Sequence, residues 1–300
     1  MESHLAFHSL LLHYKLSVML FGFFKRKKKQ RPILEKNFNC SAIAFTDKGE
    51  IKEVNEDRLV FINPFDDLVR RTKGCIAIVC DGMGGHNSGD YAAQLAIDNI
   101  PKNYYDAQAS FKESLNQAIQ KANQLIFQTA SRNTKHAKMG TTCTAVVILD
   151  QDLFIAHAGD SRIYSIAKDD IHLLTTDHTY VEHLFKSGLI SKEEKDTHPD
   201  RNIVTKVIGT QKSIEIDNYY LKNHFKNDQK LLLCSDGLYD YIKDDEIKKV
   251  VNELDKEDAA KYLIDTAKKR GGHDNISVLI VDKQSATTNS VNKKTKEVLS

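Results

Sequence analysis

The sequence predicts an α+β fold in which β-sheets pack against each other and helices cover them. The chain has 300 residues, of which 41% are hydrophobic, enough for a sizeable core. From about residue 39, short apolar runs follow one another across short polar links, which favours antiparallel pairing. Two pairs of helical segments interrupt these runs, so the helices are expected outside the sheets.

Each strand is expected where an apolar run is bounded by polar or turn residues, and about ten such runs occur. The clearest are SAIAFT (41–46), RLVFI (58–62), CIAIVC (75–80), TAVVIL (144–149), DLFIAHA (152–158), RIYSI (162–166), IHLLTT (171–176), KLLLC (230–234) and ISVLIV (276–281).

The helices are expected in two pairs. Two long helices lie between CIAIVC and TAVVIL, and in the second of them Ser110 and Glu113 have the spacing of a capping box. The other pair, at about 244–254 and 256–270, precedes the last strand.

The composition excludes several classes of protein. The five cysteines form no CxxC pair, which indicates reduced core thiols rather than a zinc site or disulfides, and none is followed by arginine at the spacing of a Cys-x5-Arg phosphate loop. No G-x-G-x-x-G or GK[ST] motif is present, so a nucleotide-binding protein is excluded.

The charge is unevenly distributed along the chain. Residues 1–36 carry a net charge of +6 and residues 283–300 carry +3, so the body between them carries −7 of the total of +2. An acidic body argues against binding to nucleic acid and suits a site for cations.

The first 36 residues are expected to form a separate leader. An apolar run at 16–24 precedes the basic KRKKKQR at 25–31, the reverse of a secretory signal, and the run is too short to span a membrane. Residues 16–31 could make peripheral contact with the inner face of the membrane, leaving the body in the cytoplasm. Alternatively, translation starts at Met19 and residues 1–18 are not made.

Acidic residues gather at the ends of the predicted strands, and two of these ends share the pattern apolar run, Asp, Gly. Each acid alone is compatible with a simple turn, but a buried cluster would repel itself unless cations neutralised it. A ligand set made only of oxygens favours Mg²⁺ or Mn²⁺. Gly82 would let a backbone carbonyl approach an ion. The candidates are Glu56, Asp57, Asp81, Asp160, Asp236 and Asp274.

Eight motifs resemble those of the metal-dependent, type 2C serine/threonine protein phosphatases, and the bacterial branch is the most similar. They occur in the family's order between about 40 and 282: NED (55–57), VCDGMGG (79–85), MGTTCTAVVI (139–148), AHAGDSRIY (156–164), TTDHT (175–179), HPDRNIVTKVIGT (198–210), LLLCSDGLYD (231–240) and GGHDNISVLIV (271–281).

The resemblance implies a four-layer α-β-β-α sandwich of two antiparallel sheets flanked by helix pairs. The catalytic domain would span 37–283 with a flap at about 177–212, and 284–300 would be a disordered polar tail. Two Mn²⁺ or Mg²⁺ ions would be held in the cleft, and a water between them would attack the phosphorus of phosphoserine or phosphothreonine. Phosphorylated proteins are the implied substrates, with a Ser/Thr kinase as the opposing partner; no feature indicates an oligomeric state.

The resemblance also assigns roles to the acids. Asp81 would bridge the ions, the Gly82 carbonyl would join one of them, and Asp236 with Asp274 would complete the other. Asp57 and Glu56 would act mainly through water, and Asp160 would help to hold a third, weaker ion.

Two departures from the family's pattern affect the expected mechanism. Met83 replaces a histidine that is a candidate proton donor, so His86 or a metal-bound water would take that role. Lys52 and Lys206 each replace an arginine, and Lys52 would bind phosphate as a point charge instead of a bidentate fork. The alternative to an enzyme is a non-catalytic scaffold, which loss of metal ligands would reveal, but the acids are all present.

Overall fold

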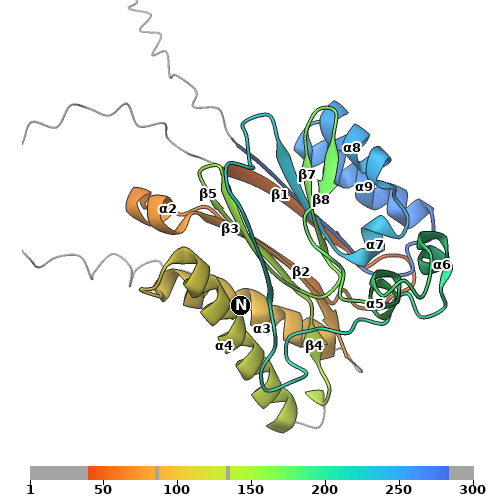
Figure 1. The fold of residues 1–300 in the computed structure, drawn as a ribbon, viewed down its shortest axis with the longest axis horizontal. Helices are drawn as coiled ribbons and strands as arrows, with labels where there is room; N and C mark the ends of the chain where they lie inside the picture. Colours follow the sequence, from red (N-terminus) through yellow and green to blue (C-terminus); the bar gives the residue numbers. More distant parts are fainter. Residues whose placement is uncertain (1–39, 85–87, 133–135, 284–300) are drawn as a thin grey trace, which may run out of the picture. The chain divides into compact units, whose positions relative to one another are not determined.

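The computed structural model describes residues 40–84, 88–132 and 136–283, and these form two antiparallel sheets with helices outside them (Figure 1). The first sheet has five strands in the order β1-β11-β10-β7-β8, which span Cys40–Asp47, Ile276–Lys283, Lys230–Cys234, Arg162–Ile166 and Ile171–Leu173. The second sheet has the order β2-β3-β5-β6-β9, spanning Asp57–Ile62, Cys75–Met83, Cys143–Leu149, Asp152–Ala158 and Asp217–Leu221, with the short β4 (Gly140–Thr141) paired to β3.

The long helices lie in pairs, as predicted. Helices α3 (Ser88–Asp106) and α4 (Phe111–Arg132) cover the second sheet, and α8 (Asp244–Glu253) and α9 (Lys256–Lys269) cover the first. The capping box is present, because the Ser110 N–H donates to Glu113 Oε2 and the Glu113 N–H donates to Ser110 Oγ. The described residues also form four short helices: α2 (Asp67–Lys73), α5 (Tyr180–Lys186), α6 (Lys192–Thr197) and α7 (Asp236–Tyr239).

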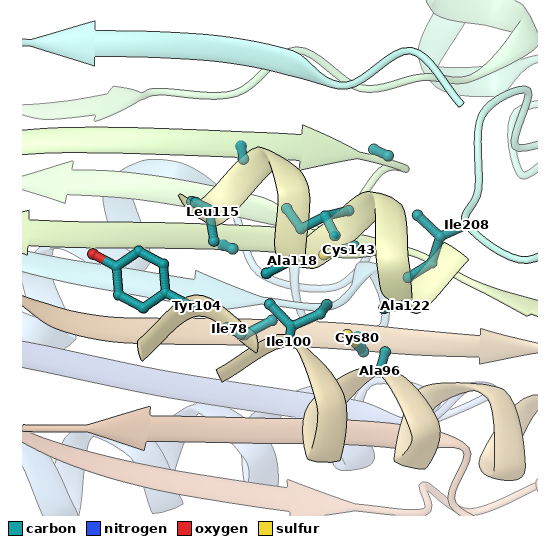
Figure 2. Close-up of a cluster of buried hydrophobic side chains, with 14 of the residues drawn as sticks. Ile78, Cys80, Ala96, Ile100, Tyr104, Leu115, Ala118, Ala122, Cys143 and Ile208 are labelled. Carbon is teal, nitrogen blue, oxygen red and sulfur yellow. The ribbon is translucent and has the colours of Figure 1, made fainter. Parts of the chain in front are cut away.

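Three apolar cores separate the four layers. One joins α3 and α4 to the second sheet and includes Ile78, Ile100 and Leu115 (Figure 2). Another joins the first sheet to α8 and α9. The central core lies between the sheets, where Val79 of β3 meets residues such as Leu233 of β10. This arrangement confirms the predicted four-layer α-β-β-α fold.

Alternation along the strands explains how the cores are filled. On β3, Ile76, Ile78 and Cys80 face the helices, whereas Cys75, Ala77 and Val79 face the other sheet. Both faces are apolar, so the strand reads as a continuous buried run. A residue two positions beyond Val79 therefore projects between the sheets.

Several elements were not predicted. Strands β4 and β9 and helices α2, α5 and α6 lie in segments without a strong apolar period, and β8 is shorter than the IHLLTT run. Helices α5 and α6 occupy the flap segment, residues 177–212. The leader, which includes Met19, and the tail lie outside the described residues. Within the described residues, no helix has the length and apolar character needed to cross a membrane.

Candidate metal centre

The candidate site lies where the central core becomes polar at one end of both sheets. Asp81 follows Val79 on the inner face of β3, and Asp57 is its direct cross-strand neighbour on β2. Cross-strand neighbours point to the same face of a sheet. The second sheet therefore places two carboxylates side by side facing the first sheet.

The first sheet supplies the matching residues. Ser235 follows β10, and its Oγ donates a 2.7 Å hydrogen bond to Asp57 Oδ2. The same oxygen accepts from the Ser277 N–H of β11 at 3.1 Å. Asp236, the next residue, begins α7. A single serine thus joins β10 and β11 to the Asp57 carboxylate of the other sheet.

Burial and mutual repulsion raise the pKa values of these acids. Desolvation, followed by the charges of Asp57, Asp236, Asp160 and Asp274, raises the pKa of Asp81 well above its ordinary value. The pKa of Asp236 is also raised by desolvation and then by neighbouring carboxylates. Burial raises the pKa of Asp57 to about 6, although the Ser235 hydrogen bond opposes the shift.

Asp274 lies at the same end of the first sheet and is paired with Lys52. Lys52 Nζ lies 2.7 Å from Asp274 Oδ1. Burial lowers the pKa of Lys52, but the hydrogen bond and charge of Asp274 outweigh burial and raise it overall. The structure therefore brings Lys52 to the acidic cluster, with its ammonium group bound to one of the acids.

Glu56 has a structural contact that its motif did not predict. Its Oε1 accepts hydrogen bonds from the backbone N–H groups of Gly89, at 3.0 Å, and Asp90, at 3.3 Å. These groups belong to the first turn of α3, whose N–H donors lack partners within the helix. Glu56 therefore fastens α3 to the candidate site, and desolvation raises its pKa.

Gly82 is needed for close packing of β3 against the same helix. A Cβ at this position would lie 2.2 Å from the Gly89 carbonyl oxygen and 2.7 Å from that of Glu56. Only glycine permits this approach. The sequence linked Gly82 to an approaching ion, and the structure adds a packing requirement that is independent of any ligand.

Besides Ser235, three polar residues that the sequence did not single out hold the acids in place. The Asp81 N–H donates to Thr142 Oγ1, and Thr141 Oγ1 donates to the Asp81 carbonyl, each at 2.8 Å. Asn275 accepts from the Glu56 N–H at 2.8 Å and donates to the carbonyls of the 48–54 segment. The only sequence feature that could have marked them is their position inside the phosphatase-like motifs, next to acids or apolar runs.

Asp160 is buried in the turn between β6 and β7, with 4% of its surface exposed. Burial, and then the charge of Asp177, raise its pKa to about 7. It contributes to the potential at Asp81 and Asp236, so it belongs to the same cluster. Lys206 instead pairs with Asp217 of β9, and His86 lies outside the described residues.

The residues fit divalent cations in their donor chemistry. The Oδ1 atoms of Asp57 and Asp236 are buried and lack a hydrogen-bond partner among the residues that the structure describes. Unpartnered buried carboxylate oxygens are costly unless a cation neutralises them. Among the described residues, no three acidic, histidine or cysteine side chains are arranged so that they could hold a metal ion as they stand. One of the candidate acids, Asp274, is bonded to Lys52 instead.

Comparisons with known proteins agree with this fold. A sequence model of the family described as protein phosphatase 2C matches residues 41–183 and 221–276. A serine/threonine phosphatase, stp, of Listeria innocua is 34% identical over 245 residues, which cover 79% of this chain and 94% of the relative.

Solved structures are similar as well. The S. agalactiae serine/threonine phosphatase aligns with a TM-score of 0.74 at 30% identity, covering 81% of this chain and 99% of that one. The catalytic domain of the serine/threonine protein phosphatase PstP, solved in complex with two manganese ions, aligns with a TM-score of 0.68 at 26% identity, covering 81% and 98%.

The fold and the acidic site thus define a phosphoprotein phosphatase of the metal-dependent class. The chain belongs to the protein phosphatase 2C family. The resemblance seen in the sequence motifs, including its bacterial branch, is confirmed by these comparisons.

Proposed function

We propose that this chain hydrolyses phosphoserine and phosphothreonine in proteins, using two Mn²⁺ or Mg²⁺ ions held between the ends of its two sheets. The observation that carries the proposal is the convergence of acids from both sheets, with unpartnered oxygens on Asp57 and Asp236. The two manganese ions in the PstP complex support the choice of ions.

In this proposal the two ions would be held by Asp81, the Gly82 carbonyl, Asp236 and Asp274. Asp57 and Glu56 would act mainly through water. When bound, the ions would supply a water nucleophile active near neutral pH and would neutralise charge on the phosphoryl oxygens. Lys52 would have to exchange its bond to Asp274 for one to the phosphoryl group.

The chain's own part in the reaction is preorganisation. Thr141 and Thr142 fix the backbone of Asp81, and Ser235 fixes the carboxylate of Asp57, so these groups need little rearrangement when the substrate binds. His86 is a proposed proton donor to the leaving serine or threonine oxygen, and bound water is the alternative.

A third, weaker ion at Asp160 extends the proposal. Few protein carboxylates would hold it, so its affinity should be low. Asp160→Ala should spare the tight pair of ions and remove a weak phase from the metal titration of phosphopeptide turnover. A titration that overlays that of the wild type would leave Asp160 as a turn residue.

We assign 37–283 to the catalytic domain with its flap at 177–212, 1–36 to a leader and 284–300 to a polar tail. The substrates are phosphorylated proteins, including the targets of an opposing Ser/Thr kinase. Residues 16–31 would give peripheral contact with the inner membrane face, from the cytoplasmic side.

The direct test is phosphate release by the purified chain from a phosphothreonine peptide and from p-nitrophenyl phosphate. Turnover should require Mn²⁺ or Mg²⁺ and stop when a chelator is added. Binding of phosphopeptide without phosphate release, at saturating metal, would instead support a scaffold.

A further inference from the structure

A partly buried arginine connects the flap segment to the body of the protein. Arg162 opens β7, and its guanidinium donates from Nε and Nη2 to the Asp177 carboxylate at 3.0 and 2.6 Å. The Arg162 and Asp177 side chains are 18% and 7% exposed. A bidentate pair with this little exposure holds its partners firmly, because separating them would leave two poorly solvated, unpaired charges.

A face of the same guanidinium packs on α7. Its central carbon lies 3.6 Å from the ring centroid of Tyr239, the last residue of the helix. The Tyr239 hydroxyl then donates a 3.0 Å hydrogen bond to the backbone carbonyl of Asp160. A continuous chain of contacts therefore runs from Asp177 through Arg162 and Tyr239 to Asp160.

Backbone contacts tie the two ends of this chain together. The His178 N–H donates to the Gly159 carbonyl at 2.8 Å, and the Gly159 N–H donates to His178 Nδ1 at 3.0 Å. The residues beside Asp177 and Asp160 thus pair directly. A shift of the first residues of the flap segment would therefore displace the backbone of the Asp160 turn.

The contact chain forms part of the wall of a cavity of about 880 Å³. The cavity is lined both by Asp160 and Asp236 of the candidate metal centre and by Lys192 and Arg201 of the flap segment. The cavity therefore lies between the candidate metal centre and the flap. Arg162 and Tyr239 are placed where they can set the spacing between these two sides.

We propose that Arg162 and Tyr239 are positioning residues that hold the flap segment and Asp160 in a fixed relation across this cavity. The functional meaning of the spacing rests on the proposed function. Arginine suits this role because its planar group binds Asp177 along one edge while its face stacks on Tyr239. Lysine has the charge but can supply neither the fork nor the stacking plane.

Hydrogen exchange of the full chain, followed by mass spectrometry, tests the coupling without metal or substrate. Arg162→Lys should speed exchange about threefold or more both in the flap segment and in peptides that contain the Asp160 turn. Tyr239→Phe keeps the stacking ring and removes only the hydroxyl, so it should speed exchange at the turn and leave the flap unchanged.

Tyr164→Phe is the matched control. The Tyr164 hydroxyl accepts a hydrogen bond from Arg162 Nη1 at 3.1 Å. Like Tyr239→Phe, this variant removes one tyrosine hydroxyl near Arg162, but the hydrogen bond from Tyr239 to Asp160 stays in place. Its exchange should match the wild type in both regions. If Arg162→Lys and Tyr239→Phe both behave like this control, the proposal is overturned. If Arg162→Lys fails to fold, Tyr239→Phe alone decides whether Asp160 is held through the hydroxyl.

Kinetics add a readout that a purely structural role would not move. Arg162→Lys should raise KM for a phosphopeptide about threefold or more and leave KM for p-nitrophenyl phosphate unchanged, because only the peptide is large enough to span the cavity. Equal changes for both substrates would contradict the positioning role. Absence of turnover in the wild type would instead count against the proposed function, while the exchange result still decides the coupling.

Discussion

The Asp81-Gly82 and Asp236-Gly237 pairs have the same sequence pattern but different local structures. After Asp81 the chain continues as strand to Met83, whereas Asp236 begins the helix α7. In both places an added Cβ would strike a backbone carbonyl, that of Gly89 at 2.2 Å or that of Asn275 at 2.1 Å. The shared Asp-Gly pattern therefore predicts a carboxylate beside a close backbone contact. It does not predict whether the chain continues as a strand or begins a helix.

The largest expected effect comes from removing either carboxylate. Asp81→Asn and Asp236→Asn should each lower Mn²⁺-dependent turnover at least about a hundredfold, because an amide cannot supply the charge that holds the ions. The fold should persist, since each change removes a like charge from the cluster. Circular dichroism and phosphate release measure the two effects.

Asp98→Asn is the control, because Asp98 is an exposed acid on the outer side of α3. It should retain wild-type turnover. If both site variants keep more than about a tenth of wild-type activity at saturating metal, the two Asp-Gly ends do not form a metal centre.

The glycines provide the next comparison. Gly82→Ala and Gly237→Ala should each lower the free energy of unfolding by on the order of 2–4 kcal/mol, because the new methyl group meets backbone atoms. Gly188→Ala is the control: its φ is +69°, but no atom lies within 4 Å of an added Cβ, so only about 1 kcal/mol of backbone strain is expected. Equal losses at all three sites in urea unfolding would contradict the packing explanation.

The sequence predicted the main features of both ends because their signals are local. Apolar runs marked β3 and β10, and the acids after them marked the site. It could not predict that Glu56 binds the first turn of α3 or that Asn275 binds Glu56, since these contacts join segments distant in the chain. The bond between Lys52 and Asp274 has the same origin.

Some secondary structure was missed for a related reason. Strand β9 is partly exposed, and α2 has no buried residue, so neither carries the apolar period that predicts an element. Helices α5 and α6 directly follow Thr179 and Ser191, whose side chains cap them. Those caps were visible in the sequence, but the short helices that follow bury too little to be recognised.

A buried histidine at the polar end of the second sheet predicts a pH effect. His157 donates from Nε2 to the Thr176 carbonyl at 3.0 Å, and burial lowers its pKa to about 4. The unfolded chain takes up a proton near pH 6.5 and the folded chain does not, so this residue makes stability fall as the pH drops from about 7 towards 4.

The contribution should reach about 2 kcal/mol between pH 7 and pH 5. His157→Gln should remove it, which urea unfolding of both proteins at the two pH values will measure. An unchanged difference between pH 7 and pH 5 in the variant would contradict the assignment to His157. The acids at the two Asp-Gly ends could not account for it, because their raised pKa values make the fold more stable as the pH drops.

The smallest effect on turnover is expected from the leader. Deletion of residues 1–36 should leave hydrolysis of p-nitrophenyl phosphate within about twofold of the full chain, because every candidate ligand lies after this segment. If residues 16–31 contact the membrane as proposed, the deletion should also move the protein from the membrane fraction to the soluble fraction. A large loss of turnover in a folded protein would place the leader within the catalytic domain.

The central claim is that acids from the two sheets together hold divalent ions, and counting bound Mn²⁺ by equilibrium dialysis tests it most directly. The wild-type chain should bind two ions tightly, and both Asp81→Asn and Asp236→Asn should lose tight binding. Two tightly bound ions in either variant, or none in the folded wild type, would contradict the claim.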